Sequence, residues 1–245
     1  MENKTGKYFK YAIGEIALVV IGILIALSIN NWNTNRINKT KENNYLVNLK
    51  NDLNNQLKII DRNLKGETHI FNSLTKAGEN YEKYKKFRAV KEELVLLTPM
   101  NARWTFTVTS PTYTDLLSTG NLDLITNDVL KNQMVLYYED LELTAQVIQK
   151  NNDYKDNVIS SKTLFIFEVL GGSNPKANYD GMDSSFNNYE TPSHLMDFIK
   201  TNISKPENEL ALINLIRFKK LVALLHMSRL ELAKTQTESL LNILK

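Results

Sequence analysis

The sequence predicts an all-α protein, in which an N-terminal transmembrane helix is followed by an antiparallel bundle of four or five helices with a long loop near 171–190. Three observations predict this fold. An apolar run lies near the N-terminus, later stretches repeat apolar residues every three or four positions, and proline and glycine mark helix boundaries. The chain then divides into a short basic cytoplasmic tail (1–10), a transmembrane helix (11–30) and a helical extramembrane domain (31–245), which we expect to be periplasmic.

The transmembrane helix is predicted from residues 11–29, which carry one charged side chain. The run matches the ~20 residues that a helix needs to cross ~30 Å of hydrocarbon. Lys4, Lys7 and Lys10 precede it, and Trp32 follows at the position of an interfacial aromatic anchor. We therefore expect the lipid bilayer to be a partner of this chain.

Two questions about this segment are its orientation in the membrane and whether it is cleaved. Arg36, Lys39 and Lys41 place a second basic cluster beyond the run, but long domains translocate largely regardless of charge. We expect a single-pass inner-membrane protein with its N-terminus inside. The alternative is a cleaved secretory signal, because the residues 26–28 have the small-x-small form of a cleavage site. The absence of a helix breaker before that site favours an uncleaved anchor.

Two features of the span bear on association. Glu15 is its one intramembrane ionisable residue, and it either anchors at the interface or faces a partner. Gly14, Gly22 and Ala26 lie on much the same helix face, and small residues let membrane helices approach closely. Such patterns also arise by chance in apolar helices, so self-association or docking to another membrane helix through this face is a hypothesis.

A resemblance to a known family supports the anchor. The run KYFKYAIGEIALVVIGILIALSINNWN, residues 7–33, resembles the N-terminus of uncharacterised single-span membrane proteins of Bacteroidota, which contain a domain of unknown function and a GEI..VVIGILIAL.INNWN signature. A weaker similarity lies in residues 112–127 and in the pair Tyr137-Tyr138. Ser28 departs from the pattern, where glutamine is more usual. The resemblance implies an inner-membrane protein with an uncleaved anchor and supplies no catalytic residue.

After the span, residues 46–64 repeat leucine and isoleucine at helical spacing with charged residues between them. We expect the membrane helix to continue as a stalk until about Gly66, and one helix of a bundle is favoured over an extended coiled coil. A further helical stretch is expected from Glu67 to Phe87. Residues 94–109 then form a connection broken by Pro99, in which RWTFTVT fits either a short strand or an extended loop.

Boundary signals place the remaining helices. Ser110-Pro111 begins a compact helix and Gly120 ends it. Thr126 or Asn127 caps a helix that extends toward Phe167 and ends at Gly171-Gly172, before the long loop near 171–190.

The C-terminal part contains two more predicted helices. Thr191-Pro192 begins a short one that ends near Ile203, and Pro206 opens the last and longest.

The composition excludes several function classes. The formal charge of +3, from 30 basic and 27 acidic residues, lacks the concentrated positive field of a nucleic-acid-binding protein. The chain has no cysteine, which excludes disulfides and thiolate sites. Its three histidines lie far apart, and no phosphate-binding loop or nucleophile motif occurs. We therefore expect no catalytic residue, no metal site and no cofactor.

One segment has the composition of a recognition surface. Arg103, Trp104, Tyr113 and Asp115 lie on a non-periodic stretch and at the start of a capped helix, and such residue types dominate interface energetics. The alternative is structural, with Trp104 and Phe106 plugging the end of the bundle.

The sequence predicts a non-enzymatic interaction or scaffold component of an envelope complex, which associates with itself or with another membrane or envelope protein. A ligand-sensing helical module that signals through a separate membrane partner is the alternative, and a membrane-tethered enzyme ranks third.

Overall fold

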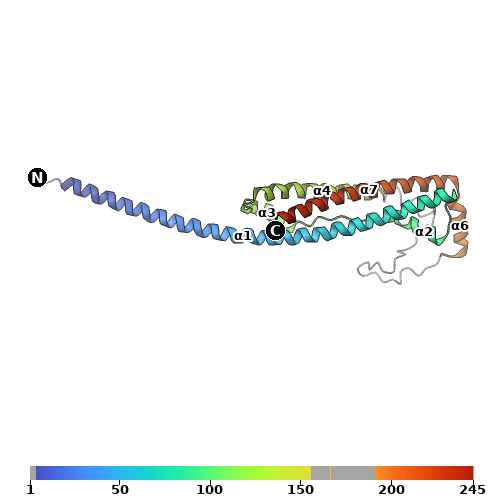
Figure 1. Ribbon diagram of the computed structural model, residues 1–245, viewed down its shortest axis with the longest axis horizontal. Coiled ribbons are helices and arrows are strands. Elements are labelled where there is room, and N and C mark those ends of the chain that lie inside the picture. The colour runs from blue at the N-terminus through green and yellow to red at the C-terminus, as the bar shows by residue number, and fades with distance from the viewer. Residues whose placement is uncertain (1–3, 156–165, 167–190, 245) are drawn as a thin grey trace. The chain divides into compact units, whose positions relative to one another are not determined.

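The computed structural model describes residues 4–155, 166 and 191–244, and this part of the chain is helical without a strand. Its elements are α1 (Lys4–Tyr84), α2 (Lys91–Leu97), the 3-10 helix η1 (Thr98–Asn101), α3 (Pro111–Ser118), the 3-10 helix η2 (Asn121–Leu124), α4 (Asp128–Lys155), α6 (Ser193–Ile203) and α7 (Pro206–Ile243) (Figure 1). The predicted all-α class is confirmed for these residues.

Helix α1 is a single helix of 81 residues. The prediction that it ends at about Gly66 is wrong, and the stretch expected as a separate helix from Glu67 belongs to α1. A glycine inside a helix costs only about 1 kcal/mol, which strong flanking packing overrides. The helix ends at Tyr84, three residues before the expected end, because Lys85 turns into the left-handed region with φ 54°.

The N-terminal part of α1 is long and apolar enough to cross a membrane. From Phe9 onward it contains an 18-residue window with a mean hydropathy of 2.6, none of which is buried against the rest of the chain. A signal sequence near an N-terminus meets the same criterion of length and composition. The membrane-spanning helix is therefore confirmed as a candidate, by its length and apolar character.

The chain divides into two compact units. The first unit comprises Met1–Asp52 and Pro111–Lys131, and the second comprises Leu53–Ser110 and Asn132–Lys245. Helices α1 and α4 therefore each contribute to both units. The predicted division into tail, span and one extramembrane domain stays a prediction.

In the first unit, side chains of α1 hold α3 and the turn after it. Asp52 accepts a hydrogen bond from the N–H of Thr112 at 2.9 Å, in the first turn of α3, where helix N–H groups lack partners within the helix. Glu42 accepts bonds from the N–H and the hydroxyl of Thr126 at 2.6 and 2.7 Å. The buried carboxylates of Asp52 and Glu42 thus supply hydrogen-bond acceptors to the backbone N–H groups of Thr112 and Thr126.

The boundary signals of this region are confirmed. Helix α3 begins at Pro111, and Gly120 follows it in the left-handed conformation with φ 68°, which glycine adopts without strain. Asn127 caps α4, because its side-chain oxygen accepts a bond from the N–H of Leu130 at 3.1 Å.

In the second unit, α4 and α7 run antiparallel. Tyr137 of α4 shares a hydrogen bond of 2.9 Å with Thr237 of α7, and Asn151 of α4 lies 3.1 Å from His226 of α7. Residue numbers rise along α4 as they fall along α7, which fixes the direction of the pair.

The C-terminal half of α1 is also antiparallel to α7. Lys234 donates to Asp61 at 2.8 Å, and His226 lies 2.9 Å from Glu67. These contacts establish a layer of three long helical segments, with α7 contacting both others, but they do not establish the predicted bundle of four or five helices. An apolar cluster fills the second unit, and its buried members are Ile70, Leu74, Ala77, Phe87, Leu94, Leu97, Met100, Ile166, Ile203, Leu212, Leu215, Ile216 and Ala223.

Residues 102–109 are extended but form no strand. Gln56 of α1 acts in place of a neighbouring strand, because its amide donates to the carbonyl of Thr107 at 3.2 Å and accepts from the N–H of Thr109 at 2.7 Å. Of the two alternatives left open for RWTFTVT, the extended loop is correct. Side chains of helices satisfy backbone groups that a strand would have paired in a sheet.

The start of α6 after Thr191-Pro192, its end at Ile203 and the start of α7 at Pro206 are confirmed. The continuation of α4 toward Phe167, the glycine pair Gly171-Gly172 and the long loop near 171–190 lie outside the described residues.

The contact between α4 and α7 gives a pH-dependent prediction. Burial raises the pKa of Tyr137 to about 12, against a smaller opposite effect of its bond to Thr237. An unfolded tyrosine ionises near ~10, so this stabilising effect is complete below about pH 10 and is lost as the pH rises toward about 12. Between about pH 9 and about pH 11 we expect the wild type to lose about 1–1.5 kcal/mol more stability than Tyr137→Phe. Urea denaturation at both pH values measures this difference, and equal losses would contradict it.

Candidate functional site

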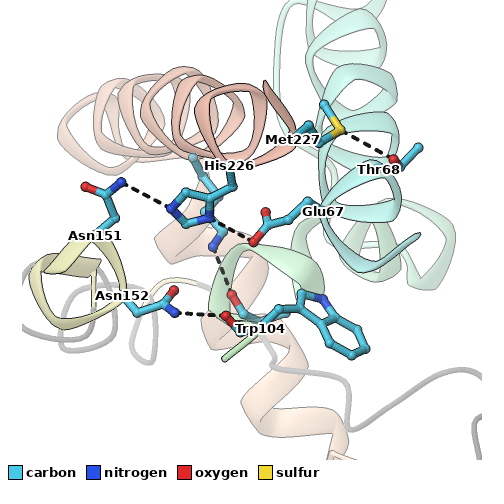
Figure 2. Close-up of polar contacts among 9 residues, drawn as sticks. Glu67, Thr68, Trp104, Asn151, Asn152, His226 and Met227 are labelled. Carbon is cyan, nitrogen blue, oxygen red and sulfur yellow. Dashed lines mark hydrogen bonds and ion pairs between the residues drawn. The ribbon is translucent and has the colours of Figure 1, made fainter. Parts of the chain in front are cut away.

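The most distinctive group of side chains is a buried polar network in the second unit. Glu67 of α1, Asn151 of α4 and His226 of α7 meet there, one from each long helix (Figure 2). The Nδ1 atom of His226 lies 2.9 Å from Oε1 of Glu67, and its Nε2 atom lies 3.1 Å from Nδ2 of Asn151. His226 is 0% exposed and Glu67 is 1% exposed.

The geometry assigns the hydrogen atoms of this network. Since Nδ2 of Asn151 is a donor, Nε2 of His226 accepts and its Nδ1–H donates to Glu67. The second oxygen of Glu67, Oε2, is buried and has no hydrogen-bond partner among the described residues. Glu67 therefore depends on His226 for its observed hydrogen bond.

A second pair of polar side chains holds the extended segment against the helices. Asn152, next to Asn151 on α4, donates to the carbonyl of Trp104 at 3.0 Å. Lys219 of α7 is 1% exposed, and its Nζ donates to the carbonyl of Ala102 at 2.9 Å. The contact between Asn152 and Trp104 is drawn in Figure 2, and together the two contacts bind the backbone of residues 102–104 to α4 and α7.

Trp104 lies directly over Gly66 of α1. A Cβ atom at Gly66 would overlap the indole atoms Cδ2, Cε2 and Nε1. The glycine that the sequence suggested as a helix end is therefore the position where α1 accommodates a large aromatic ring. Trp104 packs beside the middle of the C-terminal half of α1, so the alternative in which it plugs the end of the bundle is wrong for this residue.

The network joins a buried acid to a buried base. A glutamate beside a histidine is an acid–base pair, and both side chains are buried. Within the described ranges, no group of three or more His, Asp or Glu side chains is arranged to hold a metal ion. The network links α1, α4 and α7 through buried polar groups that need a hydrogen-bond partner at one position on the neighbouring helix. This requirement favours one register of the three helices.

The four residues of the predicted recognition surface lie in different units. Arg103 is exposed and Trp104 is half-buried in the second unit, whereas Tyr113 and Asp115 lie on α3 in the first. Asp115 accepts a hydrogen bond of 2.8 Å from the hydroxyl of Tyr45. The members of each pair are near neighbours in the sequence, and a role in recognition stays a prediction.

The predicted residues of the span all lie on the exposed part of α1. A Cβ at Gly14 or Gly22 would meet nothing within 4 Å, and Glu15, Ala26 and Trp32 are exposed. No part of the described chain covers this helix face. Their roles in packing, in the membrane interior and at the interface stay predictions.

Sequence reasoning missed the buried polar network. A signal was present, because Lys219 and His226 are seven residues apart and both fall on the buried face of α7 with Leu212 and Ala233. A charged or polar residue at a core position of an amphipathic helix requires a partner when buried. The sequence does not identify that partner, since Glu67 is 159 positions from His226.

Comparisons with known proteins give a family and no further relatives. Residues 15–191 match the model of a family of unknown function, DUF6090, and this match extends from the candidate span to the residues just before α6. No curated protein and no solved structure matches the chain.

Proposed function

From the premise that the chain belongs to this family of unknown function, DUF6090, we propose that it is a single-pass inner-membrane protein whose periplasmic helical domain is a non-enzymatic interaction component of an envelope complex. The partner is a second copy or another membrane or envelope protein. In this proposal the long helices form a bundle, and the span both anchors and associates.

The observation that carries the proposal is the continuity of α1. Its apolar window is exposed throughout, and the same helix then contributes buried side chains to both units, among them Leu49 and Leu74. An apolar helix face without internal contacts is stable in lipid or against another helix. A helix that is both exposed in this way and built into a folded core suits a protein that associates at the membrane.

The burial of the polar network supports a non-enzymatic role, because the carboxylate of Glu67 and the imidazole of His226 bind each other. A ligand-sensing module is the second candidate, and an open groove lined by Tyr81 and Phe87 favours it.

Crosslinking and affinity purification of the full chain from its own membranes test the association. We expect a defined oligomer or partner, at least threefold weaker in the double variant Gly22→Ile, Ala26→Ile, because a bulky side chain prevents close helix approach. The control, Ala17→Ile with Val20→Ile, adds apolar bulk to the opposite face and should leave association unchanged. Equal crosslinking in both variants, or none in the wild type, would remove the support.

The orientation is tested separately. The chain has no cysteine of its own, so Asn51→Cys, on an exposed position of α1, introduces a single thiol. A maleimide that cannot cross the inner membrane should label this thiol in cells whose outer membrane is permeabilised and whose inner membrane is intact. Labelling only after lysis would place the domain in the cytoplasm.

A further inference from the structure

An open groove of about 600 Å³ lies in the second unit between the C-terminal end of α1 and residues 213–220 of α7. Its floor is apolar and partly aromatic. Tyr81 and Phe87, whose ring centroids are 4.7 Å apart, line it with Ile213 and Ile216. Gly78 lies on the same face and a Cβ there would meet nothing within 4 Å, so the floor stays open. The size and lining are those of a small-molecule site.

Four charged residues line this groove, and one of them already has a partner outside it. Glu79 and Glu82 stand on α1, and Arg217 and Lys220 stand on α7. Glu82 is already bound to Lys85 at 2.7 Å, and this hydrogen bond and charge, with a smaller contribution from Arg217, hold the pKa of Glu82 below its ordinary value. With Glu82 bound to Lys85, the other charged lining residues, Arg217, Lys220 and Glu79, carry a net charge of +1.

Arg217 is the cation best placed to receive a ligand. It is exposed, and it makes no hydrogen bond or close ion pair with the described residues. Lys220, by contrast, lies 5.3 Å from the ring centre of Phe71. A guanidinium binds a carboxylate through two parallel hydrogen bonds, which gives it a preference for planar anionic groups.

We propose that this groove binds a single-chain amphiphile with an anionic head, with the alkyl chain over Tyr81, Phe87, Ile213 and Ile216 and the head on Arg217. The apolar floor excludes a strongly polar ligand, and the net charge at the edge disfavours a cationic one. The site does not depend on self-association and lies on residues outside the span, so either proposal can fail without the other.

Photocrosslinking of the full chain in lipid nanodiscs tests this site. The probes are two alkyl diazirines of equal chain length, one with a carboxylate and one with a quaternary ammonium head. Peptide mapping separates labelling of the groove from labelling of the span by the bilayer. We expect the carboxylate to label peptides from the groove at least fivefold more than the ammonium probe, and unlabelled alkyl carboxylate to compete.

Two variants and a matched control locate the head and the chain. Gly78→Phe fills the floor and should reduce labelling of the groove at least fivefold, and Arg217→Gln should reduce it severalfold for the carboxylate but not for the ammonium probe. Arg229→Gln, an exposed arginine of α7 outside the groove, is the control and should change nothing. Unchanged thermal unfolding shows that each variant is folded. Equal labelling by both probes, stronger labelling by the ammonium probe, or labelling unaffected by Gly78→Phe would overturn the proposal.

Discussion

We expect His226→Leu to destabilise the protein by about 3–5 kcal/mol, the usual consequence of leaving a buried carboxylate without its hydrogen-bond partner. His226 supplies the observed hydrogen bond of Glu67, whose other oxygen has no partner among the described residues. The substitution leaves a carboxylate 1% exposed and without a donor. Chemical denaturation of the full chain in mild detergent, followed by circular dichroism, measures the loss.

The double variant Glu67→Leu, His226→Leu separates this effect from the loss of packing. Replacing both members of a buried polar pair with apolar residues is often close to neutral, so we expect it to recover at least about 2 kcal/mol relative to His226→Leu alone. Asn151 is only half-buried and remains able to bind water. A single variant that costs less than about 1 kcal/mol, or a double variant no more stable than the single, would show that Glu67 does not depend on His226.

Gly66→Ala should destabilise the protein although alanine favours helices. The added Cβ overlaps the rigid indole ring of Trp104. The backbone of Trp104 is also held in place, because its carbonyl accepts a hydrogen bond from Asn152. Overpacking of this kind costs about 1–3 kcal/mol, against a gain of about 1 kcal/mol in helix propensity. We expect a net loss of up to about 2 kcal/mol in denaturation experiments and a red shift of Trp104 fluorescence, observed with Trp32 replaced by phenylalanine.

Gly78→Ala is the matched control, because Gly78 lies in the same helix and a Cβ there meets nothing within 4 Å. It should stabilise the protein by about 0.5–1 kcal/mol. In a Trp104→Ala background the overlap disappears, and Gly66→Ala should become neutral or stabilising. If Gly66→Ala and Gly78→Ala had the same effect in the wild type, the close contact between Gly66 and Trp104 would be disproved.

Local signals in the sequence predicted most helix boundaries correctly. Pro111, Gly120, Asn127 and Pro206 each act within one or two turns of their own position, through a fixed φ, a left-handed conformation or a side-chain cap. The apolar run near the N-terminus was equally readable, because length and composition alone define it. These features needed no knowledge of the remaining chain.

Long-range packing decided the rest. Gly66 looked like a helix end, yet it lies inside α1. Glycine is present at that position because the ring of Trp104 occupies the space of a side chain. Residues 102–109 alternate like a strand, yet Gln56 and the side chains around Trp104 satisfy their backbone groups without a sheet. The sequence by itself determined where helices begin and where the chain is apolar enough for a membrane, since those properties depend on near neighbours. Only the tertiary structure decided which buried polar groups meet, because a hydrogen bond between Glu67 and His226 depends on the register of helices distant in the chain.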